Sequence, residues 1–300
     1  MHPNSKHWLA GALFVAALVV AGWMWKNQGA APATPLAPAT PPPAQAGRAA
    51  APTPMPPTPA IPATLLAMDA GVTLAGEVGR LLATKDPKDA YTAYLLVASC
   101  VIVNDTHDLK LVDSTLRTSR ALTATERQQV TAWCGGMTER ERQARLDHLA
   151  IAARGGVAGA AWTFFAEGPF GDPSALQTRP DDPLVREWKA TAAAQLAQAA
   201  EAGDETTLLL WGFKNLKDDG TLDTDPALGY GYLLAYGLIA PDRILGGTPA
   251  AQHYAEGSDL MNALGGALSP EQRAAAMAAA QRIAAKVKAR RQRAGDQQGG

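Results

Sequence analysis

Very few residues of this 300-residue chain have the types and spacings that metal or cofactor chemistry requires. The five histidines form neither a His-x-x-His nor a His-Glu-x-x-His pattern, the spacings with which helices place two zinc ligands on one face. The acidic stretch at 219–225 fails as a calcium loop, because an EF-hand needs Gly at position six and Glu at position twelve. Counted from Asp219, those positions hold Thr224 and Tyr230. The sequence therefore predicts no metal site and no cofactor.

Glu167 is the one acidic side chain whose surroundings suit a catalytic acid. It lies between an apolar segment and the turn at Gly168-Pro169, where partial burial would raise its pKa and make it a proton donor towards a glycan. The competing interpretation, which we favour, is that Glu167 forms a cap or pairs with a neighbouring basic group. The sequence contains no Gly-x-Ser-x-Gly nucleophile elbow and no phosphate-binding glycine loop. We therefore assign no catalytic residue.

The N-terminal region contains an apolar segment that is long enough to cross a membrane. Residues 8–25 carry no charge and have Trp8 and Trp25 at their ends, where tryptophan suits the membrane interfaces. As a helix they would span about 27 Å, close to the thickness of the hydrocarbon core. We expect residues 1–7 in the cytoplasm and residues 8–25 as an uncleaved anchor in the bacterial inner membrane. A cleaved signal peptide, cut near 29–31, is the rival interpretation.

Residues 26–63 have the composition of a linker. The stretch 30–63 holds 12 of the 22 prolines, and residues 1–63 contain no Asp or Glu. Such a segment buries too little apolar surface to fold, so we expect a disordered, extended spacer in the periplasm. The remaining residues keep 24 of the 27 basic and all 28 acidic side chains, a formal charge of −4. That balance argues against nucleic acid as a partner, since binding it requires clustered cations.

The rest of the chain, 64–291, carries repeated signals for helices. Asp-Pro pairs occur at 86–87, 172–173, 182–183 and 225–226, and they place a favoured N-cap before a proline with a helical φ. Capping-box patterns begin at Thr123, Thr138 and Ser269. No segment alternates as a strand does, so we predict an all-α domain. The expected helices are 87–103, 124–134, 139–154, 157–167, 183–202, 205–216, 226–239 and 270–291.

The two cysteines, Cys100 and Cys134, are expected to form a disulfide. Export to an oxidising compartment favours a disulfide over two buried thiols. Both residues lie near the C-terminal ends of predicted helices, and an intervening helix at about 108–120 would bring those two ends to the same side of the domain. The bridge would close a loop of about 34 residues.

A faint internal repeat relates residues 149–156 to residues 196–203 at an offset of 47. The pattern Leu196-x-x-Ala-Ala-x-x-Gly-Asp204 is followed by an apolar segment at 208–213, a polar turn at 218–220 and Asp225-Pro-Ala-Leu-Gly-Tyr230. This unit resembles the Sel1-like and tetratricopeptide family of α-hairpin repeats. Residues 146–190 resemble a second copy, interrupted by the insert 169–180. The resemblance implies stacked antiparallel hairpins with a concave surface that binds proteins or peptides.

The end of the chain is basic. The predicted last helix accumulates Lys and Arg residues between 282 and 293, which suit the negative end of a helix dipole. We expect residues 292–300 to form a disordered, solvated tail. The alternative is that this basic end touches anionic lipid or a cell-wall polymer.

These observations favour a membrane-anchored periplasmic scaffold or adaptor that binds another envelope protein or peptide. Two alternatives stay open: an envelope enzyme that acts on peptidoglycan with Glu167 as its acid, and a structural protein that assembles with itself. If the repeats form a binding groove, its side chains should come from a set of aromatic residues, most of which we expect in the core. These are Trp162, Phe165, Trp211, Phe213, Tyr230 and Tyr232.

Overall fold

A computed structural model describes residues 60–62, 71–105, 110–113, 118–216, 220–245 and 248–298 of the chain. The predicted anchor at 8–25 and nearly all of the predicted linker at 26–63 lie outside these residues. Among the described helices, none combines the length and the apolar character that crossing a bilayer requires.

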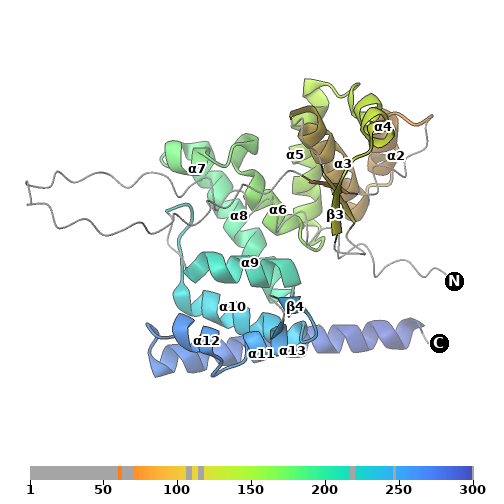
Figure 1. Ribbon diagram of the computed structural model, residues 1–300. Helices are drawn as coiled ribbons and strands as arrows, with labels where there is room; N and C mark the ends of the chain where they lie inside the picture. The colour runs from red at the N-terminus through yellow and green to blue at the C-terminus, as the bar shows by residue number, and fades with distance from the viewer. Residues whose placement is uncertain are drawn as a thin grey trace, which may run out of the picture.

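The described residues are mostly helical, which confirms the all-α class. Figure 1 shows the helices in chain order. Their bounds are α2 Leu74–Ala83, α3 Pro87–Asp105, α4 Ala124–Cys134, α5 Glu139–Arg154, α6 Ala160–Glu167, α7 Ala175–Thr178, α8 Pro183–Glu201, α9 Glu205–Leu216, α10 Pro226–Ile239, α11 Ala250–His253, α12 Asp259–Leu264 and α13 Pro270–Gln298, with a 3-10 turn at Pro169–Gly171.

The predicted helix at 108–120 is wrong. Strand β2 (Lys110–Asp113) pairs antiparallel with β3 (Thr118–Ala121), and β1 (Ala60–Pro62) pairs parallel with β2. The segment contains Val112, Thr115 and Thr118, whose branched side chains favour strands, and Asp113-Ser114 is a typical turn pair. A second small pair joins β4 (Ile244–Leu245) to β5 (Thr248–Pro249).

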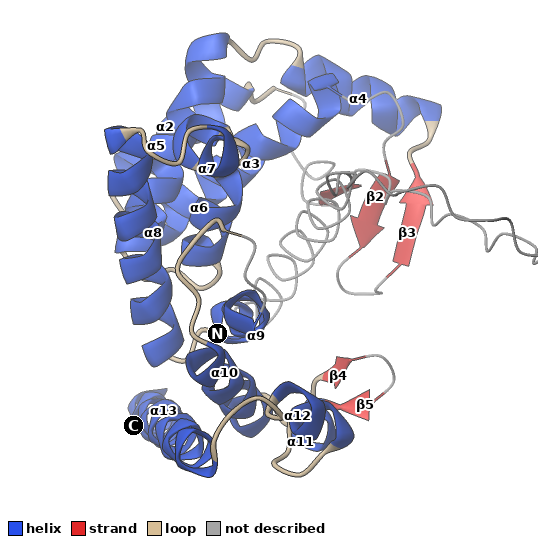
Figure 2. Cartoon of the chain, turned by 90° about the vertical axis from the view of Figure 1, so that its left-hand side faces the viewer, coloured by secondary structure: helices blue, strands red, loops and turns tan. Residues whose placement is uncertain are grey.

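The helices follow an arc, which Figure 2 shows from the side. At one end α3 packs against α2, α4 and α5, and at the other α10 lies between α9 and α13. The buried apolar residues form a core at each end. A smaller third cluster, which includes Tyr91, Tyr94 and Leu149, joins them where α3, α5 and α6 meet. The described part of the molecule is therefore built from stacked helices, in which α3 packs on α5 and α10 on α13 as well as on their neighbours in sequence.

The two segments of the sequence repeat have the same local structure. Gly156 after α5 and Gly203 after α8 both have left-handed φ angles, 67° and 75°. The amide of Val157 donates to Ala152 over 3.1 Å, and the amide of Asp204 donates to Ala199 over 2.9 Å. These are the same bond of a helix-ending Schellman turn, displaced by 47 residues. Each turn is followed by a further helix, α6 or α9.

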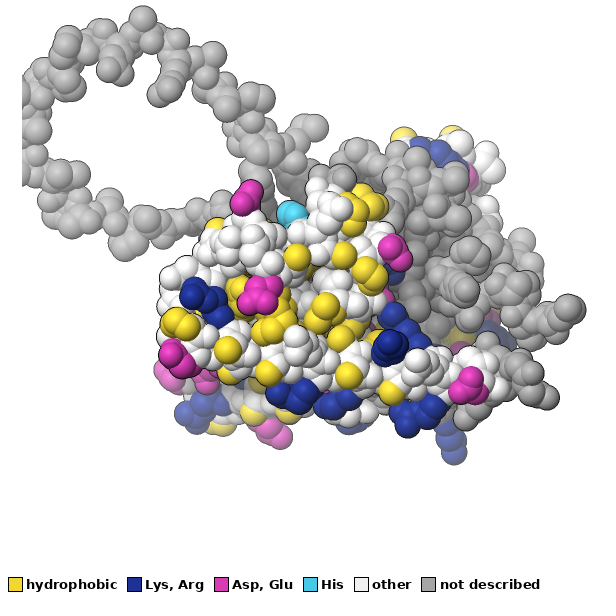
Figure 3. All heavy atoms as spheres, turned by 90° about the horizontal axis from the view of Figure 1, so that it is seen from below, with side chains coloured by type: hydrophobic (Ala, Val, Ile, Leu, Met, Phe, Trp, Pro, Cys, Tyr) yellow, Lys and Arg dark blue, Asp and Glu magenta, His cyan; other side chains and the backbone are white. Residues whose placement is uncertain are grey.

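Helix α13 is longer than expected. Residues 292–298 continue the helix to Gln298, whereas a disordered tail was predicted there. Gln292, Arg293 and Ala294, which continue the helix beyond its predicted end, are strong helix formers. Val287 is the last buried residue of the helix, and the turns after it are exposed. Figure 3, which views the molecule from below, shows Lys and Arg side chains in a row along this face.

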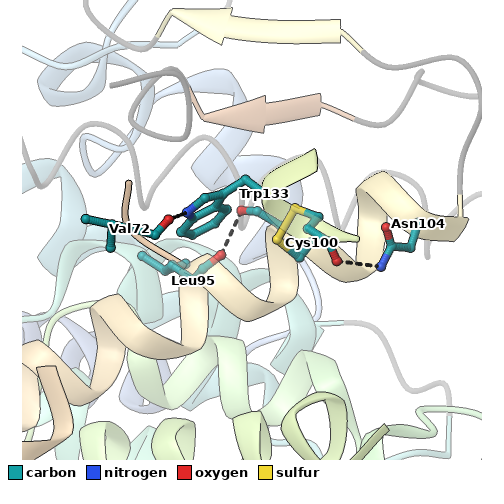
Figure 4. The surroundings of a disulfide bond; sticks show 7 residues. Val72, Leu95, Cys100, Asn104 and Trp133 are labelled. Atoms are coloured by element: carbon teal, nitrogen blue, oxygen red, sulfur yellow. Dashed lines mark hydrogen bonds between the residues drawn. A yellow bond between two sulfur atoms is a disulfide. The ribbon is translucent and has the colours of Figure 1, made fainter. Parts of the chain in front are cut away.

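Cys100 of α3 and Cys134 at the end of α4 form a disulfide, as predicted, with their Cα atoms 5.1 Å apart. Both cysteines are fully buried in the N-terminal core. Figure 4 shows two hydrogen bonds that hold α4 beside the bridge. The Trp133 indole donates to the carbonyl of Val72 over 3.0 Å, and the Asn104 amide donates to the carbonyl of Cys134 over 3.3 Å.

Candidate functional site

The aromatic residues proposed as a binding groove lie mainly inside the C-terminal core. Five of the six are at most 4% exposed, and Phe213 is half-buried against Tyr254. The ring of Phe165 lies 5.3 Å from that of Trp162 and 6.1 Å from that of Trp211, centroid to centroid. These side chains hold α6 and α9 together. The five buried ones are Trp162, Phe165, Trp211, Tyr230 and Tyr232.

Glu167 forms an ion pair, which agrees with the interpretation we favoured. One carboxylate oxygen accepts from the Tyr94 hydroxyl over 2.7 Å, and the other accepts from the Arg145 guanidinium over 2.9 Å. The Glu167 side chain is 18% exposed and that of Arg145 is 12% exposed. Burial, followed by the nearby carboxylate, raises the pKa of Tyr94 well above its usual value, so this hydroxyl stays a donor at neutral pH. Both oxygens of Glu167 are thus occupied by structural partners.

A second hydrogen bond extends this cluster. The hydroxyls of Tyr91 and Thr163 lie 3.0 Å apart, and burial raises the pKa of Tyr91 to about 12. The rings of Tyr91 and Tyr94 stack with their centroids 5.9 Å apart. Because the tyrosines come from α3 and their partners from α5 and α6, the cluster ties the N-terminal core to the following hairpin. We call this set of hydrogen-bonded side chains, Tyr91, Tyr94, Arg145, Thr163 and Glu167, the polar interlock.

Glu167→Gln should lower the free energy of unfolding by about 2 kcal/mol, because the largely buried guanidinium of Arg145 loses its charged partner. Urea unfolding measures the change. Asp105→Asn is a matched control, since Asp105 pairs with Arg142 across 3.0 Å but its side chain is 55% exposed. That substitution should cost well under about 1 kcal/mol. Equal losses in the two variants would contradict the interlock.

A pocket of about 350 Å³ lies at the turn between α8 and α9. We call it the arginine pocket. Sequence positions more than 130 residues apart line it, so no local motif marks it. Its walls are Ala158, Ala202, Gly203, Asp204, Glu205, Thr206, Arg243, Val287, Arg290, Arg291 and Ala294.

Three guanidinium groups line this pocket, and two of them share one carboxylate group. Arg243 donates to one oxygen of Glu205 and Arg291 donates to the other, each over 3.3 Å. Arg291 also donates to the carbonyl of Ile239 over 3.0 Å, at the end of α10. Arg290 donates to the carbonyl of Ala202, at the end of α8. Arg290 and Arg291, at the basic end of the predicted last helix, therefore fasten α13 to the ends of α8 and α10.

The second acidic residue of the pocket is Asp204, whose carboxylate accepts hydrogen bonds from backbone amides. Its two carboxylate oxygens accept from the amides of Gly159 and Thr207 over 2.8 and 2.7 Å. Asp204 thereby caps α9 and links the turn before α6 to the turn before α9. The sequence showed Asp204 only as a residue that follows a helix-ending glycine, without its partner 45 residues away.

No metal-binding cluster of His, Cys, Asp or Glu side chains occurs among the residues with described positions. Comparison with known proteins found no matching family model, no matching curated protein and no matching solved structure. Any function must therefore be argued from the residues themselves.

Proposed function

We propose that this chain is a membrane-anchored scaffold or adaptor of the bacterial periplasm that binds another envelope protein or peptide. The observation that supports it most is the arc of stacked helices, in which two hairpins share the same glycine-ended turn. Stacked hairpins of this kind present long surfaces to partners. The resemblance to Sel1-like and tetratricopeptide repeats points the same way. The apolar segment at 8–25 would be the anchor, and 26–63 the spacer.

The partner must contact side chains other than the buried aromatic set. Phe170, in the insert after α6, is 58% exposed, and Leu184 at the start of α8 is 57% exposed. Phe170 has a left-handed backbone with φ 60°, which costs a non-glycine residue energy, and the Arg179 guanidinium lies 5.8 Å from its ring centroid. An aromatic side chain held outward under strain is suited to contact a partner.

The test is crosslinking of the full-length anchored chain in cells, followed by mass spectrometry of the linked peptides. We expect one recurrent envelope protein linked to residues 146–240. Phe170→Asn should reduce that link severalfold without changing the melting temperature, because Asn tolerates a left-handed backbone. Leu238→Gln, an exposed apolar residue of α10, is the matched control.

Two results would contradict the proposed scaffold function. Links only between copies of this chain would indicate a self-assembling structural protein, and sedimentation of the purified chain would then give its oligomeric state. Release of peptidoglycan fragments that Glu167→Gln abolishes would indicate an enzyme. The occupied oxygens of Glu167 argue against the second result.

A further inference from the structure

We propose that the arginine pocket binds a phosphate group carried on a small organic moiety. Arg243, Arg290 and Arg291 converge on it from the segment after α10 and from α13. Guanidinium groups suit phosphate because each presents several N–H donors in a planar fork. This inference does not depend on the proposed scaffold function.

The charge in the pocket is not balanced. The described lining holds three arginines and two carboxylates, Asp204 and Glu205, and Glu205 divides its two oxygens between Arg243 and Arg291. Asp204 directs both oxygens to backbone amides. Each guanidinium has five N–H donors, and the hydrogen bonds described above occupy at most two on any one of them. The three cations therefore retain donors and a net positive charge for an anionic ligand.

The backbone adds to this preference. Helix α9 begins at the pocket, since Asp204 is its cap and Glu205 and Thr206 are its first residues. The positive end of a helix dipole favours an anion at that place. Gly203 lets α13 approach closely, because a Cβ atom there would lie only 2.1 Å from the Val287 side chain. That close approach brings α13, which carries Arg290 and Arg291, to the side of the pocket.

The apolar part of the pocket lining favours a phosphate ester over free phosphate, because it can contact the organic group of the ester. Ala158, Ala202, Val287 and Ala294 supply apolar surface beside the arginines. A volume of about 350 Å³ exceeds what one phosphate group requires. Glycerol phosphate and the headgroup of an anionic phospholipid share this chemistry, and the experiment separates them.

The test is calorimetric titration of the full-length chain in uncharged detergent with sn-glycerol 3-phosphate, with inorganic phosphate and with a short-chain phosphatidic acid. We expect saturable binding that weakens as salt rises. Arg243→Gln should weaken it about tenfold or more, by removal of a charged donor. Glu205→Gln should strengthen it, because the competing carboxylate is gone.

Arg80→Gln is the matched control, since Arg80 pairs with Glu77 on α2 and lies outside the pocket. It should leave binding unchanged. Tighter binding of the phosphatidic acid would identify a lipid headgroup as the source, and tighter binding of glycerol phosphate a soluble ester. The proposal is overturned if acetate binds as well as the phosphates do. It is also overturned if neither Arg243→Gln nor Glu205→Gln, both still folded by circular dichroism, changes the affinity.

Discussion

Reduction of the Cys100–Cys134 disulfide should lower the free energy of unfolding by about 3–4 kcal/mol. The bridge joins residues separated by 34 positions. In the chain-entropy description, closing a loop of that length restricts the unfolded state by about this amount. The loop contains α4 and the β2–β3 hairpin, and α4 has only two buried side chains, Val130 and Cys134. The N-terminal core should therefore be the part of the molecule that depends most on the bridge.

Urea unfolding with and without dithiothreitol measures this effect. The double variant Cys100→Ala, Cys134→Ala is the control, because its midpoint should not respond to the reductant. An unchanged midpoint for the unsubstituted chain would show that the bridge adds no stability. Free thiols in protein isolated from its native compartment would contradict the disulfide, since disulfides persist in oxidising compartments.

Local chemistry made most helices predictable. Helices α4, α5, α9 and α10 have the bounds that the sequence indicated. Thr123 and Thr138 form complete capping boxes, and Asp182 and Asp225 accept hydrogen bonds from the first turns that follow them. These interactions span two or three residues, so the order of residue types is enough to reveal them.

The elements that sequence reasoning missed depend on weaker or more distant interactions. Helix α2 has an N-cap at Thr73 but no acidic capping partner, and the helices α11 and α12 are only four and six residues long. Strands β2 and β3 are stabilised by pairing with each other, and that pairing is not visible in the local sequence.

The candidate sites were less predictable than the fold. The interlock joins Tyr94 to Glu167 across 73 positions, and the arginine pocket joins Glu205 to Arg291 across 86. Sequence reasoning anticipated that Glu167 would cap or pair with a basic group, because a half-buried acid needs a partner. It could not identify that partner, since the choice depends on how α3 and α5 pack. The basic end of α13 was visible, but its attachment to α8 and α10 was not.

The contact between α9 and α10 depends on two glycines that face each other. A Cβ atom at Gly229 would lie 2.6 Å from the backbone oxygen of Gly212 and 2.8 Å from Cβ of Asn215. A Cβ atom at Gly212 would lie 2.9 Å from the side chain of Leu233. Backbone atoms cannot move aside as a flexible side chain can, so the substitution must separate the two helices. Both helices contribute buried residues to the C-terminal core.

Gly229→Ala should therefore destabilise the chain by about 2–3 kcal/mol, even though Ala is the better helix former, because the cost of overpacking exceeds the gain in propensity. Gly79→Ala is the matched control: Gly79 lies in the exposed face of α2, and a Cβ atom there would meet nothing within 4 Å. That variant should gain about 0.5–1 kcal/mol, since alanine restricts the unfolded chain. The midpoints of thermal and urea unfolding should thus shift in opposite directions for the two variants. A stabilised Gly229→Ala would mean that α9 and α10 do not approach as closely as described, and the stacked arrangement of the C-terminal half would then have to be revised.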